Sequence, residues 1–319
     1  MAINFVITTS SSVTANTAGD HWIISPGVFV ATSGVTAING TGINGTKTFM
    51  IQGDIYADDA HGIDLGNNAD RSLGADNVVR IRDTGSIIAD DIAVNSSSHN
   101  FTLVNDGFLS GKNGAGIARG DFASLTNNST VTSSMGNGLE AFNNATIVNN
   151  GTVTTHNNAM LAVNDSSITN NGSVTSEYGY AVFAGMRSLV ANHGDMRGYS
   201  KVIEVNKESV VLNTGTINTS SDESEVELGH DVGIKASGGF CTVTNAGFIT
   251  VLSDEANAFG IAVGAGGNIV YNSGTITITH SQDPTVTGAG IASTTLSDDK
   301  NTIVTSGVIV SDVNAISGY

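Results

Sequence analysis

Acidic residues and histidines gather in three late segments of the chain, and their types could support chemistry. The segments are SSDESEVELGHD (220–231), VLSDEANA (251–258) and HSQDPTVTGA (280–289). The candidate ligands in them are Asp222, Glu223, Glu225, Glu227, His230, Asp231, Asp254, Glu255, His280 and Asp283. Gathered carboxylates could bind calcium, or two of them could act in glycoside hydrolysis. The third interpretation is a solvated acidic fringe, and the spacing matches neither an EF-hand loop nor an HExxH zinc site.

These segments interrupt a repeat, and the repeat must position them. The phrase apolar-x-Asn-x-Gly-x-apolar recurs over residues 101–218, in steps of 22, 22, 21, 22 and 21 residues. Its glycine position is occupied by Gly27, Gly53, Gly85, Gly107, Ser129, Gly151, Gly172, Gly194, Gly215, Gly247, Gly274 and Gly307. A period of this length is typical of stacked coils, each of which buries its apolar side against its neighbours.

Three apolar positions recur in each copy and predict three short strands per coil. The first, four residues before the glycine position, holds Ile23, Phe49, Ile81, Leu103, Leu125, Ile147, Ile168, Val190, Val211, Val243, Val270 and Ile303. The second, two residues after it, holds Phe29, Ile55, Ile87, Leu109, Val131, Val153, Val174, Met196, Ile217, Ile249, Ile276 and Ile309. The third, about ten residues after it, holds Ile63, Ile117, Leu139, Leu161, Val182, Ile203, Ile234, Ile261 and Ile291.

We therefore expect an all-β protein, a right-handed parallel β-helix of about 12 coils of about 22 residues with three strands per coil. Residues 1–20 form an N-terminal cap strand, and 21–319 form a single domain with loop insertions at 66–77, 220–231, 251–258 and 280–289. The last three insertions leave the same corner of consecutive coils. They should therefore cluster, because parallel strands lie about 4.8 Å apart.

An asparagine two residues before the glycine position predicts a side-chain ladder along one corner. Its members are Asn105, Asn127, Asn149, Asn170, Asn192, Asn213, Asn245 and Asn272. Stacked amides can donate and accept in series, and glycine beside them relieves crowding at the bend. The alternative explanation is that the asparagines are ligands or glycan acceptors, since NNST, NNGT and NNGS match the N-glycosylation motif.

Composition limits the partners. The formal net charge of −17 disfavours nucleic acid, whose phosphates repel an acidic surface. No apolar stretch reaches the length of a membrane span, so we expect no membrane insertion. The single cysteine, Cys241, excludes an intrachain disulfide framework and is expected to be an inert small hydrophobe. The N-terminal residues show no Sec signal peptide.

With its N-x-G-x-apolar repeats, the chain resembles right-handed parallel β-helix proteins of the autotransporter-passenger and filamentous-haemagglutinin-like adhesin type. The resemblance covers about residues 23–311 and implies a bacterial surface or secreted protein. The sequence lacks the signal peptide and the C-terminal membrane barrel of that pattern, and it also lacks the calcium nonapeptides of some exported repeat proteins.

From these features we expect an extracellular or cell-surface structural or adhesin-like module that self-assembles end to end into filaments or a surface layer. Its expected partners are other copies of itself and surface glycans, with no cofactor unless calcium binds the acidic loops. The alternative is a polysaccharide-active β-helix enzyme, a lyase or hydrolase. Against the enzyme, the charged residues of the central coils are dispersed along the sequence: Arg119, Glu140, Arg187, Arg197 and Glu204.

Overall fold

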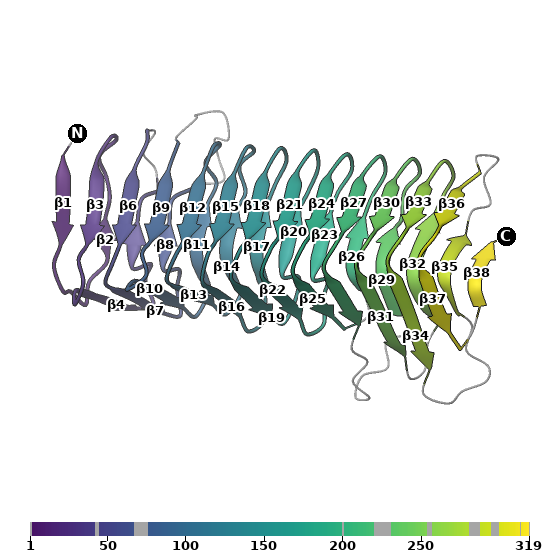
Figure 1. Cartoon of the computed structure of the whole chain (residues 1–319). Helices are drawn as coiled ribbons and strands as arrows, with labels where there is room; N and C mark the ends of the chain where they lie inside the picture. The colour runs from purple at the N-terminus through teal and green to yellow at the C-terminus, as the bar shows by residue number, and fades with distance from the viewer. Residues whose placement is uncertain are drawn as a thin grey trace. The chain divides into compact units, whose positions relative to one another are not determined.

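The computed structural model describes residues 2–41, 45–66, 76–199, 201–219, 231–253, 257–280, 288–294, 300–312 and 314–318. Its contacts divide the chain into an N-terminal unit, Met1–Asn157, and a C-terminal unit, Asn158–Tyr319. Strands build both units (Figure 1). No helix among the described residues has the length and hydropathy needed to cross a membrane. The prediction of a single domain over 21–319 stays a prediction.

The N-terminal unit contains three parallel sheets, here named A, B and C. Sheet A orders β1 (Ile3–Val6), β3 (His21–Ile24), β6 (Thr48–Ile51), β9 (Val78–Ile81), β12 (Thr102–Asn105), β15 (Ser124–Asn127) and β18 (Thr146–Asn149). Sheet B orders β4 (Phe29–Ser33), β7 (Asp54–Asp58), β10 (Ser86–Ala89), β13 (Phe108–Gly111), β16 (Thr130–Ser133) and β19 (Thr152–Thr155). Sheet C orders β2 (Val13–Thr14), β5 (Ile38–Asn39), β8 (Ile63–Asp64), β11 (Ile92–Ser96), β14 (Gly114–Ala118) and β17 (Asn137–Ala141).

The C-terminal unit repeats the three-sheet arrangement. Sheet A orders β21 (Ser167–Asn170), β24 (Leu189–Asn192), β27 (Val210–Asn213), β30 (Thr242–Asn245), β33 (Ile269–Asn272) and β36 (Thr302–Thr305). Sheet B orders β22 (Ser173–Ser176), β25 (Asp195–Gly198), β28 (Thr216–Thr219), β31 (Phe248–Ser253), β34 (Thr275–His280) and β37 (Val308–Ser311). Sheet C orders β20 (Met160–Ala162), β23 (Val182–Ala184), β26 (Lys201–Val205), β29 (Asp231–Ala236), β32 (Ala258–Gly264), β35 (Gly288–Thr294) and β38 (Asn314–Gly318).

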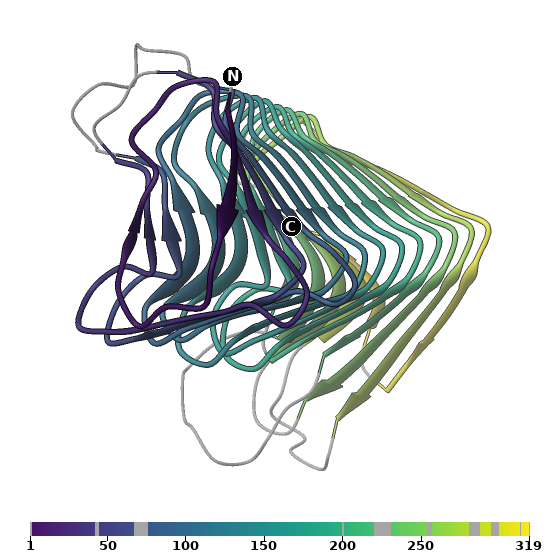
Figure 2. The same cartoon turned by 90° about the vertical axis from the view of Figure 1, so that its left-hand side faces the viewer.

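Each coil contributes one strand to each sheet, and the strands of one sheet lie behind one another along the N-terminal unit (Figure 2). The register confirms the predicted repeat, since Leu103 pairs with Leu125 22 residues later. In the C-terminal unit the step lengthens from 21 residues, between Leu189 and Val210, to 33. The longer steps coincide with the predicted insertions. The prediction of a parallel β-helix with three strands per coil is confirmed.

The core of each unit is the space enclosed by its three sheets, and the repeated apolar residues fill it. Leu103, Leu109 and Leu139, one from each sheet of the N-terminal unit, are almost fully buried. Their neighbours along each strand point outward, so the strands alternate between buried and more exposed positions, as expected for a two-sided sheet. Sheet C is the exception, because β11 and β14 are buried along their whole length.

The first coil departs from the predicted phase of the repeat. Trp22 pairs with Phe49, and Val30 pairs with Ile55. Trp22 and Val30 therefore occupy the positions predicted for Ile23 and Phe29. Phe29 instead points outward and is exposed. The physical reason is two extra residues at the corner: four residues separate Ile24 from Phe29, where two separate their partners Ile51 and Asp54. Gly27 takes the positive φ of 75° there that glycine accommodates. Both predictions for this coil were wrong by one residue.

Three other predicted core residues are displaced in register. Val79 pairs with Leu103, which places Ile81 opposite Asn105 at the corner, although Ile81 is still fully buried. In sheet C, Gly116 pairs with Leu139, so Ile117 is one position beyond the core position. The side chain of Leu103 fills the space that a Cβ on Gly116 would need. In the C-terminal unit Met160, which pairs with Val182, replaces the predicted Leu161.

The predicted asparagine ladder is confirmed within each unit. In the N-terminal unit Nδ2 of Asn105 donates to Oδ1 of Asn127, and Asn127 donates to Asn149, both at 2.8 Å. In the C-terminal unit the series Asn170, Asn192, Asn213, Asn245 and Asn272 continues with donor–acceptor distances of 2.7–2.9 Å. The backbone N–H of Gly151 also donates to Asn149, so the ladder satisfies backbone groups at the bend as well.

A second corner repeats a left-handed backbone conformation at residues that are not glycine. These residues have φ between 50° and 62°: Asn100, Phe122 and Asn144 in the N-terminal unit, and Asp165, Arg187, Glu208, Phe240 and Ala265 in the C-terminal unit. They follow the third strand of each coil. Asparagine and aspartate tolerate this conformation, whereas a bulky residue there carries strain.

Candidate functional site

The predicted acidic segments lie mostly outside the described residues. Eight of the ten candidate ligands lie outside the described residues: Asp222, Glu223, Glu225, Glu227, His230, Asp254, Glu255 and Asp283. Asp231 is described and begins β29, where it is buried and its N–H donates to the carbonyl of Asn257. His280 ends β34, in register with Ser253. A calcium or catalytic role for these segments therefore stays a prediction.

The structure brings charged groups together around Glu204, on the outward face of sheet C in the C-terminal unit. Glu204 lies between Phe183 and Lys235 in register, and only 8% of it is exposed. Its Oε1 accepts a hydrogen bond from the Ser237 hydroxyl at 2.6 Å. The ammonium of Lys235 lies 3.7 Å from Oε1, and that of Lys201 lies 4.0 Å from Oε2. We name Glu204, Lys201, Lys235, Ser237 and Tyr180 the Glu204 cluster.

Tyr180 supplies an aromatic side to this cluster. Its ring lies 5.6 Å from the ammonium of Lys201 and 5.6 Å from the ring of Phe183. Burial raises the pKa of Tyr180 to about 12, and the negative charge of Glu204 and the direct interaction of the phenol with that carboxylate add to the shift. The phenol therefore stays protonated at neutral pH and can donate a hydrogen bond, but it cannot serve there as a base.

The hydrogen-bonding capacity of the cluster is incompletely used within the described part of the chain. Oε2 of Glu204 is buried and accepts no hydrogen bond there. The two lysines lie beyond hydrogen-bond distance of the carboxylate, and their side chains are 26% and 36% exposed. The cluster holds two positive charges against one carboxylate, a local excess of cation in a chain with a net charge of −17.

Glu204 contacts Lys201, Lys235 and Ser237, none of which was predicted as a site residue. The sequence contained a usable signal, since KVIEVN (201–206) and VGIKAS (232–237) are equivalent third-strand phrases that place Glu204 opposite Lys235. The insertion at 220–231 separates them in sequence and hides the pairing. The other four central charged residues lie elsewhere. Glu140, for example, accepts a hydrogen bond from Asn137, and Arg187 forms an exposed ion pair with Asp165.

A second acidic group, in the N-terminal unit, was not predicted. Carboxylate oxygens of Asp58, Asp59 and Asp90 lie within 4.8 Å of one another. The phrase Ala-Asp-Asp recurs at 57–59 and 89–91, so the repeat contained a signal for it. Nearby, Nδ1 of His61 lies 3.0 Å from Asp91. Such oxygens suit a hard cation, but exposed carboxylates also gather without one.

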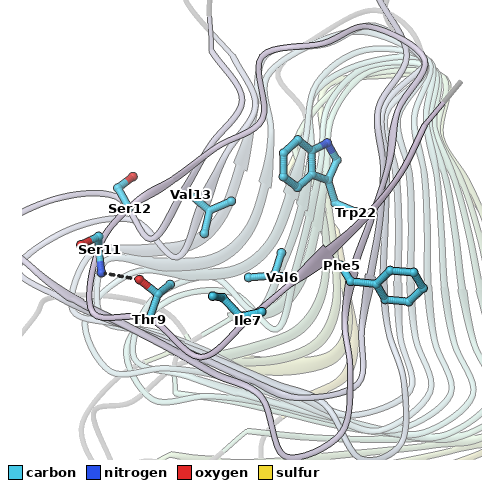
Figure 3. A pocket seen from close by; sticks show the side chains of 8 residues that line it. All are labelled: Phe5, Val6, Ile7, Thr9, Ser11, Ser12, Val13 and Trp22. Carbon is cyan, nitrogen blue, oxygen red and sulfur yellow. Dashed lines mark hydrogen bonds between the residues drawn. The ribbon is translucent and has the colours of Figure 1, made fainter.

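A pocket of about 270 Å³ opens at the start of the N-terminal unit. Figure 3 shows Val6, Ile7 and Val13 around the same hollow, with Trp22 beside it. Ile7 is 77% exposed, and Phe5 on β1 is also exposed. The indole Nε1 of Trp22 is buried and donates to no described group. The strands β1, β2 and β4 here are the first of their sheets.

The last described coil of the C-terminal unit is also uncovered on its core side. The strands β36, β37 and β38 are the last of their sheets. Ile316 pairs with Ile291 at a core position, yet Ile316 is 47% exposed whereas Ile291 is fully buried. Ile309 is half-buried, although its partner Ile276 is fully buried. Among the described residues, the inward side chains of this coil are therefore more exposed than their partners in the coil before it.

Cys241 has the predicted properties of a structural thiol. It is fully buried, and its Sγ lies 3.1 Å from the carbonyl oxygen of Asn206. Burial raises the pKa of the thiol, so little thiolate forms at neutral pH.

Comparison of the chain with protein-family models, with curated proteins and with solved structures gives no match.

Proposed function

We propose that this chain is a structural β-solenoid module that works at the cell surface or outside the cell, as adhesin-like β-helices do. Its role is to present a stiff, repetitive surface. The confirmed fold supports this proposal, because stacked coils with a buried core and a side-chain ladder set length and rigidity. The wording of the repeat supports the same class. We assign no bond-making or bond-breaking step to the chain.

In this proposal the modules associate end to end. The observation that carries it is the pair of uncovered end surfaces. One holds the edges of β36–β38 with Ile309 and Ile316, and the other holds the edge of β1 with the exposed Ile7. Both surfaces combine apolar side chains with strand edges from parallel sheets. An edge strand offers unpaired N–H and C=O groups to another strand, and a head-to-tail contact between unlike surfaces continues into an open filament.

The polysaccharide-active enzyme, our alternative, receives less support. The Glu204 cluster places two lysines and a tyrosine around one carboxylate. Hydrolysis of a glycosidic bond by the usual route needs two carboxyl groups that face each other across the bond. The Glu204 cluster resembles a binding surface more than that arrangement.

Light scattering on a size-exclusion column, from micromolar to hundreds of micromolar protein, and electron microscopy test the assembly. We expect mass to grow with concentration in steps of one chain. Ile309→Lys places a charge on one end surface and should reduce association at least tenfold, because the ammonium would have to be desolvated. Val310→Lys is the matched control, since Val310 is exposed on the same strand and points away from the core.

The two ends can be tested against each other. Ile7→Lys blocks the other surface, so a mixture of the Ile7→Lys and Ile309→Lys chains should stop at dimers joined by the two unmodified ends. Circular dichroism would check that each variant keeps its strands. A wild-type chain that stays monomeric over the whole concentration range would overturn the end-to-end proposal, as would equal loss of association in the Val310→Lys control.

A further inference from the structure

The Glu204 cluster has the composition of a ligand site, and this inference is independent of end-to-end assembly. The carboxylate of Glu204 is fixed by the Ser237 hydroxyl, and the side chain is only 11% exposed, yet its Oε2 accepts no hydrogen bond within the described part of the chain. A buried carboxylate oxygen without a donor is costly, so the arrangement favours an additional donor at this position.

The lysines provide the opposite chemistry. At 3.7 and 4.0 Å from the carboxylate, Lys235 and Lys201 are held by its charge but make no direct hydrogen bond to it. Each ammonium has three donor hydrogens, and each side chain is partly exposed, so both can turn toward an anionic oxygen. The rest of the chain is acidic and repels anions at long range. The two lysines can therefore attract an anion only at short range, which makes anion binding at the Glu204 cluster selective.

The aromatic rings provide a third kind of contact. The rings of Tyr180 and Phe183 lie side by side, and both residues keep part of their surface exposed. The centroids of Tyr178 and Tyr199 in the same unit are 5.9 Å apart. An aromatic face packs well against an apolar face of a ring.

We propose that the Glu204 cluster binds an acidic sugar residue, in which a carboxylate lies beside ring hydroxyls. The ligand carboxylate pairs with Lys201 and Lys235, a neighbouring hydroxyl donates to Oε2 of Glu204, and the apolar face of the sugar ring lies on Tyr180. Glu204 acts as a positioning residue that holds both ammonium groups on one side. A neutral sugar lacks the first contact, and a small inorganic anion lacks the other two.

Isothermal titration calorimetry with an α-1,4-linked galacturonate tetramer tests the site. The comparison ligands are its methyl ester, which removes the charge and keeps the ring, neutral maltotetraose, and free glucuronate. We expect binding of the acidic tetramer and about a tenfold or greater loss with the methyl ester or maltotetraose, since a pair of charged hydrogen bonds is lost. Binding of free glucuronate would show that a single sugar residue is recognised. If the tetramer binds and free glucuronate does not, the site recognises several residues of a polymer.

The variant Lys201→Met/Lys235→Met should lose at least tenfold in affinity for the tetramer. Glu204→Gln should lose affinity for the acidic tetramer and for free glucuronate alike, because it releases both lysines. The matched control is Arg197→Met/Lys207→Met, which also removes two positive charges, from exposed residues of the same unit, and should change affinity less than twofold. Saturation-transfer NMR should place the tetramer on tyrosine protons, and Tyr180→Ala should remove that signal.

Two results would overturn the inference. One is that neither galacturonate tetramer nor glucuronate binds the folded chain at millimolar concentration. The other is that the control pair and the Lys201→Met/Lys235→Met variant lose affinity equally, which would show general charge attraction. Circular dichroism on every variant separates loss of the site from loss of the fold.

Discussion

Asn105 lies in register with Ile81 in sheet A, and this pairing ends the asparagine ladder of the N-terminal unit. Each ladder amide donates to the next asparagine along the chain, so the first one has no amide before it. Oδ1 of Asn105 is accordingly buried without a donor among the described residues. The aliphatic side chain of Ile81 fills the place where a further asparagine would stand.

This relationship predicts that rungs of the ladder differ in their contribution to stability. Asn127→Leu should lower the free energy of unfolding by about 2–3 kcal/mol, because Asn127 donates to Asn149 and accepts from both Asn105 and Ser129. Asn105→Leu should cost less than about 1 kcal/mol, because it also removes a buried oxygen without a donor. Urea unfolding measures both. Equal losses in the two variants would contradict the order of the ladder.

The left-handed corner predicts a stabilising substitution. Phe122 has a φ of 62° and is exposed, and its equivalents in neighbouring coils, Asn100 and Asn144, are asparagines. Phe122→Asn should raise the free energy of unfolding by about 0.5–1 kcal/mol, since asparagine accepts this conformation with less strain. Phe108→Asn is the control, because Phe108 is an exposed strand residue of the same unit. That change should destabilise, as strands favour aromatic residues. A loss of stability in Phe122→Asn would argue against strain at this corner.

The raised pKa of Asp64 leads us to predict that the stability of the fold depends on pH. Burial raises the pKa of this carboxyl, and hydrogen bonds from the N–H of Gly66 and from Asn95 offset only part of the shift. The folded state therefore binds the proton more tightly than the unfolded state, whose pKa is about 3.9. The stability contributed by protonated Asp64 is full below about pH 3.9 and is lost as pH rises through the raised value. The advantage of wild type over Asp64→Asn should fall across this window, as measured by urea unfolding at several pH values.

Asp20 offers a control of opposite sign in the same unit. The N–H of Ala2 and the amide of Asn4 donate to its carboxylate and lower its pKa. The stability that ionised Asp20 contributes is therefore fully present above the pKa of the unfolded state, and it is lost as pH falls through the lowered pKa of the folded state. The advantage of wild type over Asp20→Asn should grow with pH. If the two variants show parallel curves, a general effect of net charge explains the data and the assignment to Asp64 fails.

Local pattern in the sequence predicted most of the fold. The step between Leu103 and Leu125, or between Asn127 and Asn149, is visible in the printed sequence because each coil repeats the same burial problem. The errors occur where a corner changes length. Two extra residues at the corner that holds Gly27 shifted Ile23 and Phe29 out of the core, and no repeat count reveals which residue takes a positive φ.

The Glu204 cluster shows the limit more clearly. Repeat position is enough to pair Lys235 with Glu204, and Lys201 lies on the same strand as Glu204. Tyr180, before β23, and Ser237, after β29, reach the same carboxylate from outside the strands. Their meeting depends on how side chains lie on the outward face, where no buried apolar pattern constrains them.

By itself, the sequence determined the three-sided coil, its repeated core and the asparagine corner, because burial and backbone geometry impose the same residue types on every turn. Tertiary structure alone decided where that pattern stops and what its outward face can bind. The end of the ladder at Ile81, the exposure of Ile316 and the gathering of charge around Glu204 all depend on neighbours in space that lie far apart in sequence.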